Sequence, residues 1–406
     1  MLNNRVAVVG AGYAGMAAAV TLAEGGISVT VLEAGALPGG RARRVSAQGR
    51  DLDNGQHILV GAYTELARLM RTVGVPDGAL LRLPLEIRYP GRFRLRAALP
   101  GRPGLLAALL LAGGATLAER VSGIAFIHRL RAAGFRLAED TSVERLLERD
   151  GQTGALAHYL WRPLCISALN TPPELASAQR FLAVLRDALC GPSGASDLLL
   201  PKVDLSRLFP EPAADYVRAR GGEIRYGAAV RSLSDLSSFG KVILAVGPHQ
   251  VKNVAPELAR EFTYQPITTC YLQYSDATAL AFPMLGLADG LVQWVFDRGA
   301  LTGEKGRLAC VISAQGDHQQ LALDELAERC HRELAQVVPG LPSPLWSQVI
   351  AEKRATIACS PSQEKVSIET SLRGVYLAGD YTDPEYPPTL EAAVRSGVRA
   401  AALAAA

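Results

Sequence analysis

The sequence predicts an α/β protein in which an α+β substrate-binding domain is inserted into a Rossmann-like dinucleotide-binding domain. Three features predict this fold. A glycine-rich loop joins a strand to a helix near the start of the chain, a strand ends in Gly-Asp near its end, and a long stretch of different character separates the two. With 406 residues, the chain is long enough for two or three domains.

The first feature is a strand–helix–strand unit. We predict a buried strand at residues 6–9, a helix at residues 16–23 and a second strand at residues 28–32. The loop between the first strand and the helix has the G-x-G-x-x-G spacing that is typical of dinucleotide-binding folds.

In this loop Gly10 allows a tight turn, Gly12 lets a diphosphate approach the backbone, and Gly15 lets the helix pack closely on the strand. The helix N-terminus offers free N–H groups and a partial positive charge to the phosphates. Glu33 ends the second strand, where a carboxylate accepts hydrogen bonds from an unphosphorylated ribose. The unit therefore favours FAD or NAD over NADP.

A second glycine pair follows the second strand. Gly39 and Gly40 precede Arg41, and this pattern suits a loop over a diphosphate with a guanidinium that makes charge-assisted hydrogen bonds. Residues 51–61 are predicted to run from a strand into a turn of small residues, and residues 63–74 to form a helix.

Between about residues 80 and 199 the chain is rich in Leu and Ala, and we predict a largely helical unit after an arginine-rich strand region. Its most apolar run, residues 105–118, is interrupted by Gly113-Gly114 and flanked by arginines. A bilayer span needs about 20 apolar residues, so this run is too short to cross a membrane. Two interpretations stay open: a buried helix, or a segment that dips into a membrane surface.

The α/β pattern then returns. We predict helices at residues 213–220 and 320–337, and strands at residues 223–226, 241–248, 268–274, 291–296 and 307–313, with Val230 in a further strand.

Near the end of the chain a predicted strand runs into Gly379-Asp380, and Thr389 and Leu390 open the last helix. Asp380 is suited to accept a hydrogen bond from a ribityl hydroxyl. The N-terminus of the last helix is suited to face the flavin N1–C2=O edge, where negative charge gathers on reduction. A simple NAD dehydrogenase has no need of this element, so the two ends together predict FAD.

The composition excludes other classes of protein. With 42 basic and 39 acidic residues, the net charge of +3 is too balanced for a nucleic-acid partner. The six cysteines contain no C-x-x-C pair and the histidines fit no metal spacing, so we expect reduced thiols, no metal site and a cytoplasmic location. The first strand begins so early that no signal peptide is expected.

These motifs resemble the amine oxidase/phytoene desaturase family of FAD enzymes, and the resemblance runs from end to end. Three internal strings are similar to its squalene-associated branch, the hydroxysqualene dehydroxylases: NGQHILVGAY at residues 54–63, WRPLCISALNTPP at residues 161–173 and DLSRLFP at residues 204–210. The loop at residues 381–388 departs from this branch, because it carries Tyr386 and extra prolines.

The resemblance implies an FAD-binding domain of the amine-oxidase (GR2) type with an inserted substrate-binding domain. The FAD-binding domain would comprise residues 1–70, 200–258 and 360–406, and the substrate-binding domain residues 71–199 and 259–359. It also implies that Gly55 lies in the cofactor site and that Val230 contacts the adenine end through its backbone.

The reaction implied is the replacement of the allylic hydroxyl of hydroxysqualene by hydride from reduced flavin, which gives squalene. It needs an external flavin reductant, an apolar pocket and a proton for the departing water. We nominate His57 for the proton, because a histidine pKa lies near neutrality; a structural role beside the flavin is an equal interpretation. The aromatic side chains nominated for the substrate pocket, each alternatively an ordinary core residue, are Trp161, Tyr271, Trp294, Phe296 and Tyr386.

A polyprenoid substrate also predicts peripheral contact with the inner membrane. Two other functions stay open. A carotenoid or terpenoid desaturase of the same fold would run hydride transfer in the opposite direction, and a non-catalytic FAD protein would carry a polyprenoid between membrane enzymes. An amine oxidase is disfavoured because no aromatic cage is evident, although Cys359 leaves a covalently attached flavin open.

Overall fold

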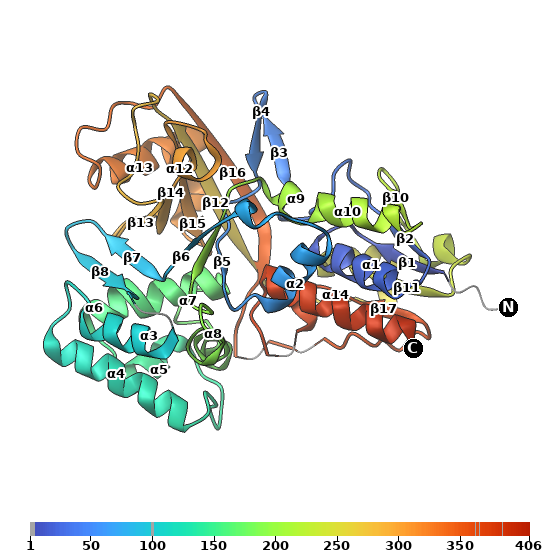
Figure 1. The fold of residues 1–406 in the computed structure, drawn as a ribbon, viewed down its shortest axis with the longest axis horizontal. Coiled ribbons are helices and arrows are strands. Elements are labelled where there is room, and N and C mark those ends of the chain that lie inside the picture. Colours follow the sequence, from blue (N-terminus) through green and yellow to red (C-terminus); the bar gives the residue numbers. More distant parts are fainter. Residues whose placement is uncertain (1–4, 99–100, 362, 365, 384) are drawn as a thin grey trace.

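The computed structural model describes the chain except residues 1–4, 99–100, 362, 365 and 384. Figure 1 shows a parallel sheet with helices on both faces at one end of the molecule, and an antiparallel sheet above a group of helices at the other. The labelled C-terminus lies beside the parallel sheet.

The parallel sheet has the strand order β10-β2-β1-β11-β17, so it gathers strands from distant parts of the sequence. Its strands are β1 (Val6–Val9), β2 (Val29–Leu32), β10 (Glu223–Arg225), β11 (Lys241–Leu244) and β17 (Val375–Leu377). Every neighbouring pair is parallel. Strands β1 and β2 are buried throughout, as expected where helices cover both faces of a sheet.

Helices on one face of this sheet share an apolar cluster with its strands. They are α1 (Tyr13–Glu24), α2 (Thr64–Thr72), α10 (Pro210–Ala219) and α14 (Leu390–Ala405). Gly397 lets α14 approach α1, because a Cβ at this position would overlap the carbonyl oxygen of Ala14. On the other face, α11 (Pro248–Val254) packs in a second cluster.

The antiparallel sheet has the order β13-β14-β15-β12-β16. Its strands are β12 (Tyr264–Gln273), β13 (Met284–Gly286), β14 (Trp294–Asp297), β15 (Arg307–Ser313) and β16 (Trp346–Ile357), and the helices beside it are α12 (Arg298–Thr302) and α13 (Leu323–Ala335). Side chains alternate between its faces. Val295 lies in the cluster that includes α13, whereas Trp294 and Phe296 face the helices of the middle of the chain.

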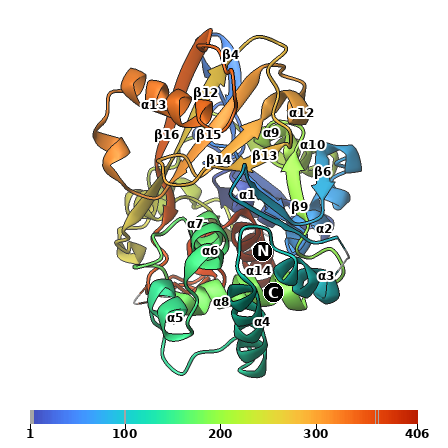
Figure 2. The ribbon, with the colours of Figure 1, turned by 90° about the vertical axis from the view of Figure 1, so that its left-hand side faces the viewer.

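The middle of the chain forms the helices below this sheet in Figure 2. They are α3 (Gly101–Leu110), α4 (Leu117–Ala132), α5 (Val143–Arg149), α6 (Gly154–Leu156), α7 (Arg162–Leu169) and α8 (Ala178–Cys190), preceded by the hairpin of β7 (Glu86–Tyr89) and β8 (Phe93–Arg96). A π-helical turn at Ala157–Trp161 joins α6 to α7. The remaining elements are β3 (Arg44–Ala47), β4 (Arg50–Asp53), β5 (Leu59–Val60), β6 (Leu80–Leu83), β9 (Leu198–Pro201), α9 (Leu205–Leu208) and 3-10 turns at residues 77–79, 233–236, 256–258, 317–320 and 380–382.

The structure confirms the predicted α/β class and most of the predicted elements to within a few residues, but two expectations are wrong. Val230 lies in an irregular segment rather than a strand, because the chain turns after β10 and the N–H of Ala228 donates to the carbonyl of Glu33 instead of pairing in the sheet. The apolar run at residues 105–118 is not one helix: α3 ends at Leu110 and a turn precedes α4. The domain boundaries stay a prediction.

Candidate cofactor and substrate site

The glycine-rich loop lies between β1 and α1 and matches its predicted geometry. Gly10 has a positive φ of 102°, and a Cβ there would lie 2.6 Å from the carbonyl oxygen of Ala245. A Cβ on Gly15 would overlap the carbonyl oxygen of Gly10. Gly12 is the N-cap of α1, and no side chain accepts a hydrogen bond from the first N–H groups of this helix. The first turn also contains no acidic residue. These N–H groups are therefore available to bind phosphate.

The second glycine pair closes over the first loop. The N–H of Gly39 donates to the carbonyl of Ala11 at 2.8 Å, and Gly39 forms a short parallel bridge with Gly12. A Cβ on Gly12 would lie 3.7 Å from the Cα of Gly40. The two loops therefore form a narrow cradle lined by backbone, which a diphosphate can approach closely.

Glu33 and the segment that contains Val230 lie together at the other side of this cradle. The Glu33 carboxylate accepts hydrogen bonds from the N–H groups of Ala11 and Gly35, each at 2.7 Å. Ala228 is tied to the carbonyl of Glu33 by its N–H, and Val230 packs against the apolar cluster that holds Leu32. This arrangement suits the ribose and adenine end of a dinucleotide.

The two ends of the chain meet at Arg41 and Asp380. The Arg41 guanidinium donates to Oδ1 of Asp380 at 2.7 Å and to the carbonyl of Ala355 at 2.8 Å. The N–H of Gly379 donates to Oγ of Ser396 on α14. Thr389 caps α14 nine residues after Asp380, and Leu390 is the first residue of this helix.

Two buried polar groups near this cradle have no hydrogen-bond partner among the described residues: the Tyr381 hydroxyl and Nδ1 of His249. Tyr381 follows Asp380, and the backbone of His249 donates to the Tyr264 hydroxyl. A buried donor or acceptor without a partner is costly, so a ligand that supplies hydrogen bonds is expected beside them. The cradle, the open helix N-terminus and these groups fit FAD.

His57 lies where β4 leads into β5, on the loop that also carries Gly55. Gly55 has a positive φ of 98°, and Nδ1 of His57 lies 3.0 Å from its carbonyl oxygen. That contact places the proton on Nδ1 and leaves Nε2 as an acceptor. Burial and the nearby Arg41 guanidinium lower the pKa of His57, despite the opposing hydrogen bond to Gly55. The surroundings therefore favour the neutral form of the ring.

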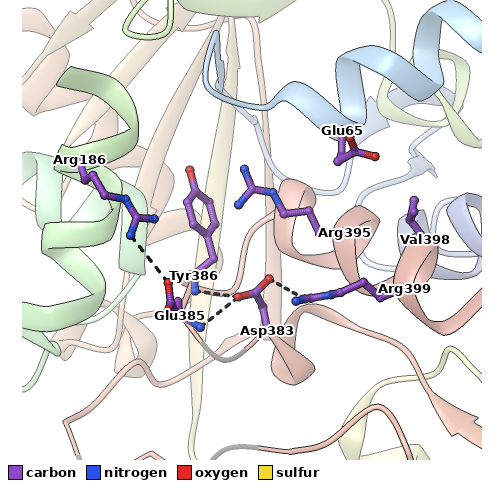
Figure 3. A pocket seen from close by; sticks show the side chains of 8 residues that line it. All are labelled: Glu65, Arg186, Asp383, Glu385, Tyr386, Arg395, Val398 and Arg399. Carbon is purple, nitrogen blue, oxygen red and sulfur yellow. Dashed lines mark hydrogen bonds and ion pairs between the residues drawn. The ribbon is translucent and has the colours of Figure 1, made fainter. Parts of the chain in front are cut away.

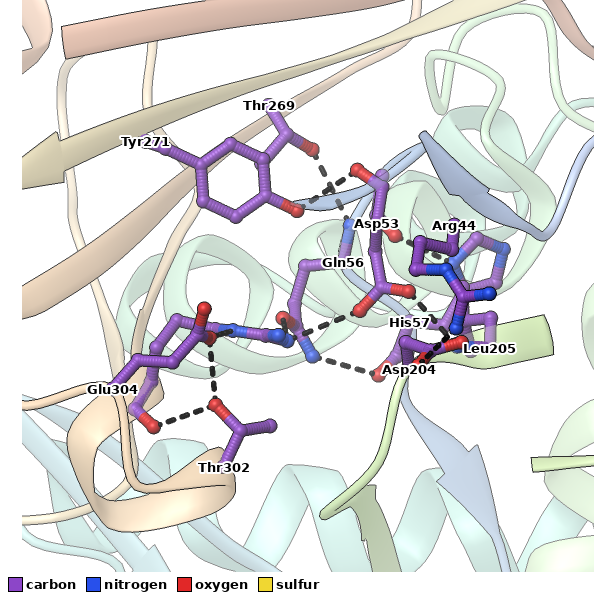
Figure 4. A network of polar contacts seen from close by, with 12 residues as sticks. Arg44, Asp53, Gln56, His57, Asp204, Leu205, Thr269, Tyr271, Thr302 and Glu304 are labelled. Atoms are coloured by element: carbon purple, nitrogen blue, oxygen red, sulfur yellow. Dashed lines mark hydrogen bonds and ion pairs between the residues drawn. The ribbon is translucent and has the colours of Figure 1, made fainter. Parts of the chain in front are cut away.

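A buried ion pair supports this loop, and it was not predicted. Figure 4 shows Asp53 among Gln56, Tyr271 and the N–H of Leu205. Oδ2 of Asp53 pairs with Arg298 at 3.1 Å, and both side chains are less than 5% exposed (2% and 4%). Arg298 also donates to Oε1 of Gln56 at 3.0 Å. Burial raises the pKa of Asp53 to about 6, against the opposing charge of Arg298.

Four of the five predicted substrate-pocket residues lie in one apolar cluster, formed by the antiparallel sheet and the middle helices. They are Trp161, Tyr271, Trp294 and Phe296. Their polar atoms are already bonded: Tyr271 donates to the carbonyl of Asp53, Trp161 to Gln152 and Trp294 to Ser167. Ile58, next to His57, packs against the same cluster.

Tyr386 lies apart from that cluster. It lines a cavity of about 310 Å³ with charged side chains of α8, α14 and the loop before α14, as Figure 3 shows. The guanidinium of Arg395 lies 4.6 Å from the centre of its ring. The structure therefore separates Tyr386 from the other four aromatic residues. Its role in substrate binding, like theirs, stays a prediction.

Two further expectations were that the chain has no metal site and that Cys359 leaves a covalently attached flavin open. Among the described residues, no group of histidine, cysteine or carboxylate side chains is arranged to hold a metal ion. Cys359 is buried against α8, where its backbone N–H donates to Thr171 and Arg180 approaches its sulfur at 3.8 Å.

Solved structures share the whole fold. An oxidoreductase from Methanosarcina mazei matches with a TM-score of 0.71 at 16% identity, over 98% of this chain and 100% of that chain. Cyclohexylamine oxidase from Brevibacterium oxydans matches with a TM-score of 0.64 at 16% identity, over 99% of each chain. These structures establish the fold, and the cradle described above fits FAD.

The family model for flavin containing amine oxidoreductases matches residues 13–405. Curated relatives are the hydroxysqualene dehydroxylases of Rhodopseudomonas palustris (31% identical, over 99% of this chain and 98% of the relative) and of Sinorhizobium fredii (29% identical, over 99% of each). A probable zeta-carotene desaturase of Synechococcus elongatus is 21% identical over 98% of each chain. The chain belongs to the flavin-containing amine oxidoreductases, in the branch of the hydroxysqualene dehydroxylases.

Proposed function

We propose that the protein removes the hydroxyl of hydroxysqualene reductively and releases squalene. The carbon–oxygen bond of the allylic alcohol breaks, its oxygen leaves as water with one added proton, and a hydride forms the new carbon–hydrogen bond. An external reductant restores the two electrons to the flavin. The observation that carries this proposal is the end-to-end similarity to curated hydroxysqualene dehydroxylases at 26–31% identity.

When bound and reduced, FAD supplies the hydride. The chain's own contribution is an apolar surface of aromatic faces on which a substrate cation can lie without meeting a nucleophile. The described geometry supports this role, because the polar atoms of Trp161, Tyr271 and Trp294 are bonded to neighbouring residues. The polyprenoid would lie along the cluster that contains these rings.

His57 is our proposal for the proton that leaves with the hydroxyl. Because the lowered pKa favours the neutral ring, His57 must first take a proton, and Nε2 is the nitrogen that can take it. Replacing His57 by Ala should then lower kcat far more than KM and should remove the alkaline limb of the pH profile, which is the fall of kcat as the pH rises through the pKa of this histidine. A variant that retains FAD and the wild-type pH profile would exclude His57 as the donor.

The decisive experiment is to incubate purified holoprotein with hydroxysqualene and a chemical reductant of flavins, and to identify the product by gas chromatography and mass spectrometry. Squalene supports the proposal. Bound lipid without conversion indicates a carrier, and an unreacted alcohol with no bound lipid contradicts both functions.

The similarity to zeta-carotene desaturases favours a second candidate, a desaturase acting on a terpenoid hydrocarbon. The same holoprotein with phytoene-type hydrocarbons and an electron acceptor would then form conjugated double bonds. This product would appear with oxidised rather than reduced flavin, so the two candidates are distinguished by the direction of electron flow.

We place this activity on the cytoplasmic side of the inner membrane, because the proposed substrate is a lipid. In the part of the chain that the structure describes, no helix combines the length and apolarity needed to cross a membrane. Contact with the bilayer would therefore be made by a surface of the folded protein.

A further inference from the structure

The corner between α3 and α4 exposes an unusual group of apolar side chains. Of the large apolar side chains that the structure describes as exposed, five lie within residues 106–121: Leu106, Leu110, Leu111, Leu117 and Val121. We call these five residues the leucine corner. Large contiguous apolar exposure on a folded protein marks a binding surface.

The exposure is not a sign of loose packing, because the opposite side of the same segment is buried. Ala108, Leu109, Ala112 and Ala115 are all at least 90% buried, and they belong to the cluster that contains Trp161 and Trp294. The turn between the two helices is pinned to β8 by paired backbone hydrogen bonds between Gly113 and Arg94, at 2.8 and 3.1 Å. The leucine corner is therefore a fixed surface.

Positive charge lies beside the leucine corner. The guanidinium of Arg120 donates hydrogen bonds to the carbonyls of Leu110 and Ala115. Among the described residues, no carboxylate pairs with it. On the adjoining hairpin one carboxylate, Glu86, faces the three arginines Arg88, Arg94 and Arg96, so the group keeps a net positive charge. Glu119 is turned inward to the N–H groups of Thr116 and Ala155.

We propose that the leucine corner docks the protein on an anionic lipid bilayer. Aliphatic side chains with a rim of arginines suit the boundary between acyl chains and anionic headgroups, whereas protein interfaces are enriched in aromatic residues. The corner lies at the end of the molecule away from the parallel sheet (Figures 1 and 2). This inference rests on the proposed function for its rationale, since a lipid substrate would enter from the bilayer.

The test is sedimentation of the FAD-loaded protein with vesicles of phosphatidylcholine, with and without phosphatidylglycerol. Wild type should bind the vesicles that contain phosphatidylglycerol, and concentrated salt should weaken this binding because it screens the arginines. The double variant Leu111→Ser/Leu117→Ser should lower the partition coefficient by about tenfold or more, since two leucine side chains lose their burial in lipid.

The matched control is Leu323→Ser/Leu345→Ser, which removes two leucines of similar exposure elsewhere: 59% and 76%, against 67% for Leu117 and 75% for Leu111. The control should bind vesicles as wild type does. Both double variants should keep the wild-type flavin absorption and melting temperature.

Three results would overturn the inference: a wild-type protein that does not sediment with vesicles, a corner variant that binds as wild type does, or equal losses in the corner and control variants. A dimer that dissociates in the corner variant, without any vesicle binding, would assign the surface to a second copy of the chain. The outcome is independent of the reaction: vesicle binding without squalene formation in detergent would reject the proposed function and leave the docking surface standing.

Discussion

The two parts of the molecule are held together by different kinds of contact. Around the parallel sheet, backbone groups approach one another so closely that only glycine fits, as at Gly15 and Gly397. Elsewhere, an apolar cluster joins the antiparallel sheet to the middle helices, and a buried ion pair joins β4 to α12. The packing around the parallel sheet depends on glycines at fixed positions. The packing of the antiparallel sheet on the middle helices depends on apolar burial, which many sequences can supply.

The sharpest test of this difference is Gly15→Ala. The new methyl group would overlap the carbonyl oxygen of Gly10, and we expect a loss of more than about 5 kcal/mol in the free energy of unfolding, or no folded holoprotein. Gly78→Ala is the control, because a Cβ at Gly78 meets nothing within 4 Å. Thermal unfolding that is equal in both variants would show that the contact is not rigid.

In the second part the largest effect should come from Arg298→Met. This change leaves the carboxylate of Asp53 buried without its cation, which costs about 3 to 5 kcal/mol of stability. The double variant Asp53→Asn/Arg298→Met should recover much of the loss, because no buried charge remains unpaired. Denaturant unfolding of both single variants and the double variant measures the coupling, and additive losses would argue against the pair.

The same carboxyl group should make stability depend on pH. The folded protein holds the proton of Asp53 up to a pKa of about 6, whereas the unfolded chain releases it near 3.8. The contribution is therefore fully present below pH 3.8 and is lost as the pH rises through about 6, by about 2 to 3 kcal/mol. The variant Asp53→Asn should not lose stability in this way. The difference in unfolding free energy between wild type and variant, measured at several pH values, should therefore change between about pH 3.8 and pH 6. A constant difference would contradict the shifted pKa.

The smallest effect is expected at the cofactor. Asp380→Asn removes the charged partner of Arg41 and the proposed acceptor for the ribityl chain, and should raise the FAD dissociation constant by about tenfold. Flavin fluorescence quenching measures this. Asp197→Asn breaks an ion pair of equal length, 2.7 Å, with Arg82 and should leave FAD affinity unchanged. Equal effects in both variants would mean that Asp380 acts on stability alone.

The same contrast explains what the sequence predicted. The glycine spacings and Gly379-Asp380 revealed the cradle because the backbone geometry there admits few alternatives. Arg298 and Asp53 lie far apart in the chain, and no local pattern links them. The edge strand β16 was not predicted because its many polar residues hide the alternation of a strand with one exposed side. The exposure of Leu111 and Leu117 was not predicted either. It depends on the turn between α3 and α4, which is seen only in the folded structure.

The strand order of the parallel sheet has a consequence for biosynthesis. Strand β11 pairs with β17, and Asp380 follows β17 directly, although some 130 residues separate the two strands (Leu244 to Val375). During translation the ribosome therefore releases both glycine loops of the first segment long before Asp380 exists. If these loops and Asp380 hold FAD as proposed, the cofactor site is complete only after Asp380 has been synthesised, and until β17 exists the open edge of the sheet at β11 is unpaired in the nascent chain.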